Sequence, residues 1–352
     1  MDRKNHNTTL FCLSPSKKVQ TKPIMNSKAS DSSARTPDIY EPWKTLTPEI
    51  YDEWDEDEDK LWKASLESLI NGEQTPFQAS QNIDAFIREV TSSRLTKLIE
   101  YADTHDVTAE ERQFGIYEEG IYVPDASTYA NVILRTFGKA CTAFPPRSET
   151  QNRLVGLLEE LRGLPRWMAP ELGPDEKGQV NSTEFWKFGG IEESWIGLED
   201  AFRREHAVLK PTLDRDHHPC ELHARWRNLQ HIMARITASD LIYCGGFNAL
   251  SDLVPSIQPN KDPTRYKKRN MDFSIIAAAQ WVVGPHECRF VYHECLKRET
   301  IEHFWKPWSK EGWAFWKIEF ANVIDNTHYD ERTQVVAREA LQQMETTEKQ
   351  SD

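Results

Sequence analysis

The chain has 352 residues and a formal net charge of −13, which speaks against a general nucleic-acid partner because such binding depends on cationic contacts to phosphates. No apolar run approaches the about 18 residues that span a bilayer, and the N-terminal residues lack the apolar core of a secretory signal, so we expect an intracellular protein of the cytoplasm or nucleus without a membrane partner. The 6 cysteines form no CxxC pair and are too sparse for a disulfide framework, which indicates reduced thiols.

Residues 1–45 have almost no apolar periodicity and are rich in Ser, Thr, Asn, Lys and Pro. Such a segment cannot bury enough surface to offset the loss of chain entropy, so we predict a disordered N-terminal arm. Met25 is a candidate for an alternative start of translation, and whether Met1 or Met25 is the true start stays open at this point. The basic residues of the arm are interpreted as part of a solvated tail, with import or an anionic partner as the alternative. They include Lys17, Lys18, Lys22 and Arg35.

The residues after the arm predict a cluster of helices. Pro48 has the position of a first helical residue, and the apolar pattern continues to Gly72, with the acidic run 55–59 inside this helix. Thr75 and Pro76 repeat the combination of a cap and a proline, so a second helix is predicted to begin there. A third helix is predicted from one further stripe of apolar residues: Leu95, Leu98, Ile99 and Ala102.

The next segment predicts an irregular connection and two helices. Residues 105–125 mix glycines, tyrosines and acids, a composition typical of a surface loop. Ser127 is predicted to cap the helix that follows. Ser148 and Gln151 form a capping box, and the leucine stripe after them ends at Gly163.

The density of Pro and Gly in residues 166–180 predicts a long loop between two sub-lobes. Asn181 and Glu184 resemble the N-terminal cap of another helix. No stretch shows the period-2 alternation of a strand, so the predicted fold class is all-α. The predicted organisation is a disordered arm at 1–45, an all-helical domain at 46–344 with sub-lobes 46–165 and 181–344, and a polar tail at 345–352.

Two consecutive apolar helices are predicted at the centre of the fold, between Leu222 and Val254. Gly245 and Gly246 lower the helix propensity of the second one by about 1 kcal/mol each, so we expect a close crossing of two helices there. The first helix carries Leu222, Trp226, Leu229, Met233 and Ile236, and the second carries Leu241, Cys244, Phe247, Leu250 and Leu253.

The C-terminal part predicts further helices. Residues 273–283 are apolar almost all round, which is typical of a helix that is covered on every side. Ser309 is predicted to cap a later helix. The stripes of the remaining helices are Cys288, Val291, Tyr292 and Cys295, then Trp313, Trp316, Phe320 and Ile324, and finally Val336, Ala337, Ala340, Leu341 and Met344.

Four further features of the sequence occur in a fixed order: Arg153–Arg162 with the following Gly-Leu-Pro, Trp226–Gln230 with Met233–Thr237, Ala277–Trp281, and Glu311–Lys317. In this order the segments resemble an uncharacterised family of filamentous ascomycete proteins that is known only as a domain of unknown function. The resemblance would cover about residues 76–344. It implies a fungal source and a helical fold, and it supplies no activity, cofactor or catalytic residue.

The strongest ligand-like cluster lies just before and within the first central helix. Imidazole and thiolate are suitable zinc ligands, and Cys220 and His223 would stand one helical turn apart. His217 or His218 could complete such a site from the preceding loop. The favoured alternative is that Asp216 is part of a helix cap, with Pro219 as the first helical residue and the two histidines solvated. The full cluster is Asp214, Asp216, His217, His218, Cys220 and His223.

The triplets 286–288 and 293–295 both read His-Glu-Cys. Their spacing places the two cysteines on one helix face and the two histidines on a neighbouring face, which is awkward for a single metal site. We therefore interpret them as core cysteines beside surface histidines.

The acidic run 55–59 invites comparison with magnesium-binding motifs, but Mg²⁺ needs oriented carboxylates together with substrate phosphates rather than charge alone. A solvated helix face is the preferred interpretation.

The tryptophans near the C-terminus could line a pocket for a small apolar ligand. Trp313 and Trp316 fit a core stripe, so Trp305 and Trp308, which flank a proline in a predicted loop, are the better pocket candidates. The sequence has no GxSxG, P-loop or GxGxxG motif, and we assign no catalytic, cofactor-binding or metal-binding residue.

Three functional hypotheses remain. The first is a non-catalytic helical interaction or scaffold protein with a protein or peptide partner, in keeping with the disordered arm. The second is an accessory enzyme or ligand-binding protein of fungal small-molecule metabolism, because an aromatic-rich helical body can enclose an apolar metabolite. The third is a zinc-binding helical protein that uses the cluster around His217.

Overall fold

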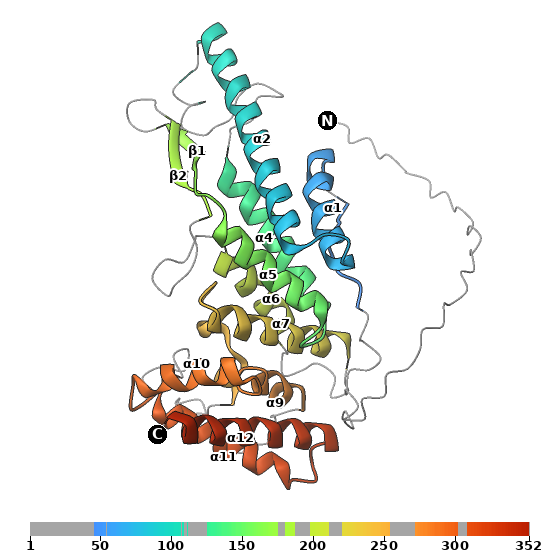
Figure 1. Ribbon diagram of the computed structural model, residues 1–352, viewed down its shortest axis with the longest axis vertical. Coiled ribbons are helices and arrows are strands. Elements are labelled where there is room, and N and C mark those ends of the chain that lie inside the picture. The colour runs from blue at the N-terminus through green and yellow to red at the C-terminus, as the bar shows by residue number, and fades with distance from the viewer. Residues whose placement is uncertain are drawn as a thin grey trace, which may run out of the picture. The chain divides into compact units, whose positions relative to one another are not determined.

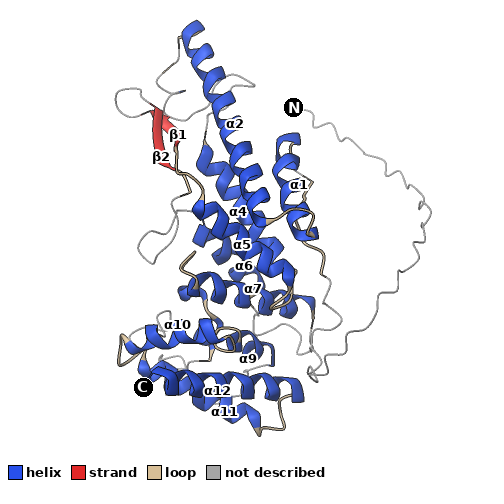
Figure 2. Cartoon of the chain, in the orientation of Figure 1, coloured by secondary structure: helices blue, strands red, loops and turns tan. Residues whose placement is uncertain are grey.

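The structure is a computed structural model that describes residues 46–53, 55–106, 108, 111, 125–174, 180–186, 198–210, 220–253, 272–301 and 308–351. All of these described residues belong to one compact unit. Its described part is mostly helical, with one two-stranded hairpin, and the predicted all-α class is confirmed (Figure 2). The predicted arm at 1–45, including Met25, lies outside the described residues. None of the described helices combines the length and apolarity needed to cross a membrane.

Figure 1 labels the helices and strands, and their bounds are as follows. The helices are α1 (Asp57–Asn71), α2 (Pro76–Thr104), α4 (Ala126–Cys141), α5 (Glu149–Gly163), α6 (Leu198–Leu209), α7 (Glu221–Ala238), α9 (Asp272–Ala279), α10 (Pro285–Leu296), α11 (Lys310–Ile324) and α12 (Glu331–Ser351), with 3-10 helices η2 (Gly245–Phe247) and η3 (Ala249–Asp252). The strands are β1 (Met168–Pro174) and β2 (Val180–Glu184).

Helix α1 begins at Asp57, so the prediction that it begins at Pro48 is wrong. Glu56 is the N-cap, and its backbone N–H donates to the Asp59 carboxylate while the Glu56 side chain accepts from the backbone of Asp59. Acidic side chains in the first turn complement the positive end of the helix dipole, which favours a start within the acidic run. The predicted end is confirmed, because Gly72 follows the helix in a left-handed conformation with φ 78°.

Helix α2 begins as predicted, with a capping box between Thr75 and Gln78 and with Pro76 in the first turn. It then continues without a break to Thr104, so the predicted third helix is the second half of α2. No Gly or Pro interrupts the sequence between Phe77 and Thr104, and nothing local therefore ends the helix earlier.

The cap of α4 differs from the prediction, and that of α5 agrees with it in part. Asp125, rather than Ser127, caps α4 by accepting from the backbone N–H of Thr128 at 3.1 Å. Ser148 caps α5 by accepting from the backbone N–H of Gln151 at 3.2 Å. The Gln151 side chain does not complete a capping box, because its amide turns inward to backbone carbonyls.

The predicted loop at 166–180 is wrong for residues 168–174, which form β1, while residues 175–179 lie outside the described part of the chain. The predicted cap at Asn181 and Glu184 is also wrong, because both residues lie in β2, which pairs antiparallel with β1. Met168 pairs with Glu184, and the register shifts between Pro170 and Pro174. Prolines are tolerated in such a hairpin because each strand has an edge without a partner strand in the described sheet. Local composition therefore suggested a loop where long-range pairing forms strands.

Helix α7 buries the predicted stripe except for Leu222, which is 37% exposed, and most of its other faces are buried as well. The second predicted helix does not form, because the chain turns at Asp240, with φ 54°, and continues as the short helices η2 and η3. A Cβ atom on Gly245 would lie 2.6 Å from Cζ of Tyr243, so this glycine gives room to a folded-back ring rather than to a crossing helix.

The C-terminal helices agree with most of the predictions. Ser309 Oγ accepts from the backbone N–H of Gly312 at 3.0 Å and so caps α11. Helix α12 continues to Ser351, so most of the predicted polar tail is helical, and Thr347 in it is buried. One apolar core extends from Ile50 to Met344, and the division into two sub-lobes stays a prediction.

Candidate functional site

Helix α7 concentrates buried polar side chains at the centre of the fold, and we take it as the candidate site. Burying a polar group is unfavourable unless it is hydrogen-bonded, so the partners of these side chains indicate what the helix does. The buried polar residues of α7 include His223, Arg225, Arg227, Asn228, Gln230 and His231.

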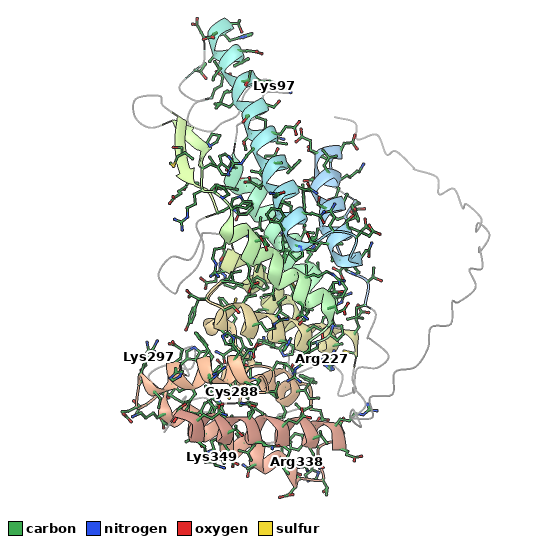
Figure 3. The ribbon with its side chains drawn as sticks, in the orientation of Figure 1. Lys97, Arg227, Cys288, Lys297, Arg338 and Lys349 are labelled. Carbon is green, nitrogen blue, oxygen red and sulfur yellow. The ribbon has the colours of Figure 1, made fainter. Side chains whose placement is uncertain are left out.

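Asn228 connects α7 to the turn between α4 and α5. Its Nδ2 donates to the backbone carbonyl oxygen of Thr142 at 2.8 Å, and the backbone carbonyl oxygen of Asn228 accepts from Nε2 of Gln151 at 3.2 Å. Nε and Nη2 of Arg227 donate to Oδ1 of Asn228 at 3.1 and 2.9 Å, and Figure 3 shows Arg227 on α7. These bonds hold the turn against the helix.

Gln230 connects α7 to the segment that was predicted as a helix. Its Oε1 accepts from the backbone N–H of Ala249 at 2.9 Å and from Nε1 of Trp281 at 2.6 Å. Its Nε2 donates to the carbonyl oxygen of Phe247 at 3.3 Å. One amide therefore satisfies the backbone of η2 and η3 and orients a buried indole.

Two histidines near α7 are held in the neutral form. Burial, with smaller contributions from nearby arginines, lowers the pKa of His231 to about 3, and its Nε2 accepts from the backbone N–H of Arg147 at 3.3 Å. Burial also lowers the pKa of His206 to about 4, and the ring of His206 lies 4.9 Å from that of Trp226. A neutral imidazole that accepts at Nε2 carries its proton on Nδ1, and Nδ1 of His231 has no hydrogen-bond partner among the described residues.

Arg225 joins α7 to the segment before α1. Its guanidinium donates to Glu221 at 2.8 Å, to Oγ1 of Thr142 at 3.1 Å and to the carbonyl oxygen of Thr47 at 3.1 Å. The polar side chains of α7 thus act mainly as supports for backbone segments that pack around the helix.

The predicted zinc cluster is described only in part. Cys220 is the N-cap residue of α7, and the backbone N–H of His223 donates to its carbonyl oxygen at 3.1 Å. The His223 ring stacks on Phe273 with centroids 3.9 Å apart, and burial lowers its pKa. His217 and His218, like Asp214, Asp216 and Pro219, lie outside the described residues. In the described ranges, no three His, Cys, Asp or Glu side chains gather as metal ligands would.

The repeated His-Glu-Cys triplets have the arrangement that their spacing predicts. On α10, Cys288 and Cys295 are buried, whereas His286 and His293 are exposed (Figure 3 labels Cys288). Burial raises the pKa of the Cys288 thiol to about 12 and also raises that of Cys295, so both thiols stay protonated.

The acidic run has local structural roles. Glu56, Asp57 and Glu58 are exposed, in agreement with a solvated helix face. Asp59 accepts from Nε1 of Trp62 at 3.1 Å, and Asp55 forms a nearly buried ion pair with Lys63. These contacts stabilise the start of α1.

The described C-terminal tryptophans are packed in the core. The ring of Trp308 lies 5.8 Å from that of Trp281 and 6.0 Å from that of Trp316. Nε1 of Trp316 donates to the carbonyl oxygen of Leu250 at 3.0 Å, and Nε1 of Trp313 donates to Glu348 at 2.7 Å. The other predicted pocket residue, Trp305, lies outside the described residues.

One polar constellation was missed at the sequence level. Oδ1 of Asp84 on α2 accepts from Nε1 of Trp167 at 3.0 Å and from Nε1 of Trp186 at 2.6 Å. Oδ2 accepts from Nε of Arg88 at 2.7 Å, and the Arg88 guanidinium lies over the Trp167 ring. The only signal in the sequence was the spacing of Asp84 and Arg88 by one helical turn, which is common on solvated helices.

The central part of the chain matches a known protein family. The family described as Protein of unknown function (DUF3632) matches residues 135–320, more than half of the chain. The chain belongs to this family. The predicted resemblance to a family of unknown function is therefore confirmed, although the match is shorter than the predicted 76–344. No curated protein and no solved structure matches the DUF3632 chain. The matched residues include all of α7, whereas α1, α2 and α12 lie outside them.

Proposed function

We propose that this DUF3632 protein is a non-catalytic interaction or scaffold protein that binds a protein or peptide partner. The observation that carries the proposal is an apolar stripe on the second half of α2, where residues 92–104 bury only Tyr101. Figure 1 shows this end of α2 extending beyond α1. The stripe consists of Leu95, Leu98, Ile99 and Ala102.

The spacing of this α2 stripe suits a partner with an apolar groove. Positions i, i+3, i+4 and i+7 lie on one helix face and are the usual anchors when a helix docks in such a groove. Ile99 is 52% exposed and Ala102 is exposed, while Leu95 and Leu98 are half-buried. Exposed apolar side chains that gather on one face are typical of contact surfaces.

The buried polar side chains of α7 favour a non-catalytic role. Asn228, Gln230 and Arg225 use their donors and acceptors on the backbone of neighbouring segments, so these groups hold the fold together.

The test compares two matched variants of the full-length chain. A partner cross-linked to the protein in its native cells is identified and purified, and its affinity is measured by calorimetry. We expect Ile99→Asp to weaken binding by about 10- to 100-fold, as for a central contact residue. Phe77→Asp changes a side chain of similar exposure, 51%, at the other end of α2 and should alter affinity less than about two-fold. Equal losses for both variants would contradict the proposed surface.

The resemblance to filamentous ascomycete proteins supports a fungal source, and we place the protein in the cytoplasm or nucleus. A fluorescent fusion observed in its source cells would test that location.

An accessory enzyme or ligand-binding protein of fungal secondary metabolism is a second candidate. The three packed indoles of Trp281, Trp308 and Trp316 favour it, because such a cluster could admit a small apolar molecule by moving one ring. This role would be supported if apolar metabolites quench the tryptophan fluorescence of the unaltered chain and if Trp308→Leu abolishes that quenching. An unchanged metabolite profile after deletion of the gene would oppose it.

Zinc binding is a third candidate. It is supported by His223, whose Nδ1 is buried and has no hydrogen-bond partner among the described residues, close in sequence to Cys220. If this candidate is correct, elemental analysis of the purified full-length protein will find stoichiometric zinc, and the His223→Gln variant will have lost that zinc.

A further inference from the structure

The segment before α1 behaves like a bound peptide. We call residues 46–49 the strap (Figure 1, in the blue coil that leads into α1). The strap has neither helix nor strand, and in the described part of the chain no backbone-to-backbone hydrogen bond holds it. Ile50, which follows, is buried in the main core and anchors the strap at one end. The residues that precede the strap lie outside the described part of the chain.

The strap inserts one side chain into a small apolar cluster of its own. Leu46 is 9% exposed and packs with Ala143, Ala224 and Ile276 in a cluster separate from the main core. Phe144 and Val336 border the same cluster. We call this surface, together with Arg225, the strap seat. Its alanines come from the α4–α5 turn and from α7, and their small side chains leave room for a leucine.

Arg225 gives the strap seat a polar contact of defined direction. Glu221 at 2.8 Å and Thr142 at 3.1 Å hold its guanidinium, and the side chain is 8% exposed. Its Nη2 donates to the carbonyl oxygen of Thr47 at 3.1 Å and lies 3.6 Å from a carboxylate oxygen of Glu49. A positioned guanidinium that meets a backbone carbonyl and a carboxylate is a typical element of peptide recognition.

We propose that the strap seat is a peptide-binding site that the strap occupies in cis and that an extended peptide of a partner protein occupies in its place. The chemistry of the strap defines that peptide: an apolar side chain in the position of Leu46, a free backbone carbonyl next to it, and a carboxylate three residues after the apolar one. This site is separate from the α2 stripe, so either can fail without the other.

The strap competes with any added peptide because it is tethered beside its seat. Tethering through Ile50 corresponds to an effective concentration on the order of millimolar, which masks the site in the resting protein. Weakening the strap therefore exposes the site.

The experiment measures the anisotropy of a fluorescein-labelled peptide with the sequence of residues 46–51, Leu-Thr-Pro-Glu-Ile-Tyr, added to the full-length chain. We expect the Leu46→Asp variant to bind the peptide at least about 10-fold more tightly than the unaltered chain, because its own strap no longer competes. A peptide with Asp in place of the leucine should not bind. Leu61→Asp is the matched control, since Leu61 is 67% exposed on α1 and outside the seat. This control should bind the peptide like the unaltered chain.

The outcomes are distinct. A folded Leu46→Asp variant, verified by its circular dichroism melt, that fails to bind millimolar peptide would overturn the proposal and make the strap a permanent part of the core. If Leu46→Asp does not fold, Leu46→Ala takes its place, with a smaller gain expected and the same refutation. An unaltered chain that is dimeric in solution and becomes monomeric with Leu46→Asp would overturn a foreign peptide as occupant, because the strap of a second copy would then fill the seat.

Discussion

Asp84 offers a sharp test of what joins the hairpin to α2. Replacing it with Ala removes the acceptor of two indole N–H groups, whereas Asn keeps a carbonyl oxygen where Oδ1 stands and changes only the contact to Arg88. The two variants therefore separate the indole bonds from the ion pair.

The magnitudes follow from burial. Trp186 is 1% exposed, so leaving its N–H unpaired costs about 2 to 3 kcal/mol, and the half-buried Trp167 adds about 1 kcal/mol. Arg88 has a 38% exposed side chain, so its ion pair contributes no more than about 1 kcal/mol after solvent screening. We expect Asp84→Ala to lower the free energy of unfolding by about 3 to 5 kcal/mol and Asp84→Asn by about 1 kcal/mol.

The assay is urea unfolding of the full-length variants, followed by tryptophan fluorescence and circular dichroism. Asp103→Ala, which removes an exposed carboxylate from the same helix, is the control and should change stability by less than about 0.5 kcal/mol. Equal losses for Asp84→Ala and Asp84→Asn would refute the reasoning, because the indole bonds would then contribute nothing beyond the ion pair.

Three further predictions concern pH, thiols and a turn. In the unfolded chain His231 has a pKa near 6.5, whereas burial lowers its pKa in the folded protein to about 3. The contribution of the neutral imidazole to the free energy of unfolding is therefore complete above about pH 6.5. It falls by about 1.4 kcal/mol for each pH unit below that value. Unfolding free energies at pH 7.5 and 5.5 should show a smaller decrease for His231→Gln than for the unaltered chain, and equal decreases would contradict the assignment. The buried thiols of Cys141, Cys244, Cys288 and Cys295, whose pKa values burial raises, should react with Ellman's reagent only after denaturation, and rapid reaction in the native chain would count against the packing. Gly72→Ala should lower the free energy of unfolding by about 1 to 2 kcal/mol in thermal melts because φ is 78°, while a neutral result would show that the turn relaxes.

Sequence reasoning succeeded where the deciding contact is local. Thr75 with Gln78, Ser148 with Gln151 and Ser309 with Gly312 each form a cap within three residues, so the helix starts follow from residue type and spacing. The buried stripes of α5, α7 and α11 follow from the same helical period.

Prediction from the sequence failed where contacts between segments distant in sequence determine the local structure. Residues 241–253 have a helical apolar pattern, yet Gln230 and the folded ring of Tyr243 hold them as turns and short 3-10 helices. Of the candidate zinc cluster, the sequence identified Cys220 and His223 correctly as neighbours at the start of α7, but it could not indicate that the His223 ring would stack on Phe273.

What the sequence by itself determined is the all-helical class, the helix ends that a local cap or glycine marks, and the burial of aromatic side chains in the apolar stripes, because these depend on hydrogen bonds and periodicities within a few residues. Only the tertiary structure decided the hairpin, the role of Asp84 and the seat of the strap. Asp84 meets Trp186 across 102 residues, and Arg225 meets Thr47 across 178, so neither pairing leaves a trace in local composition. Such contacts form only when packing brings the segments together.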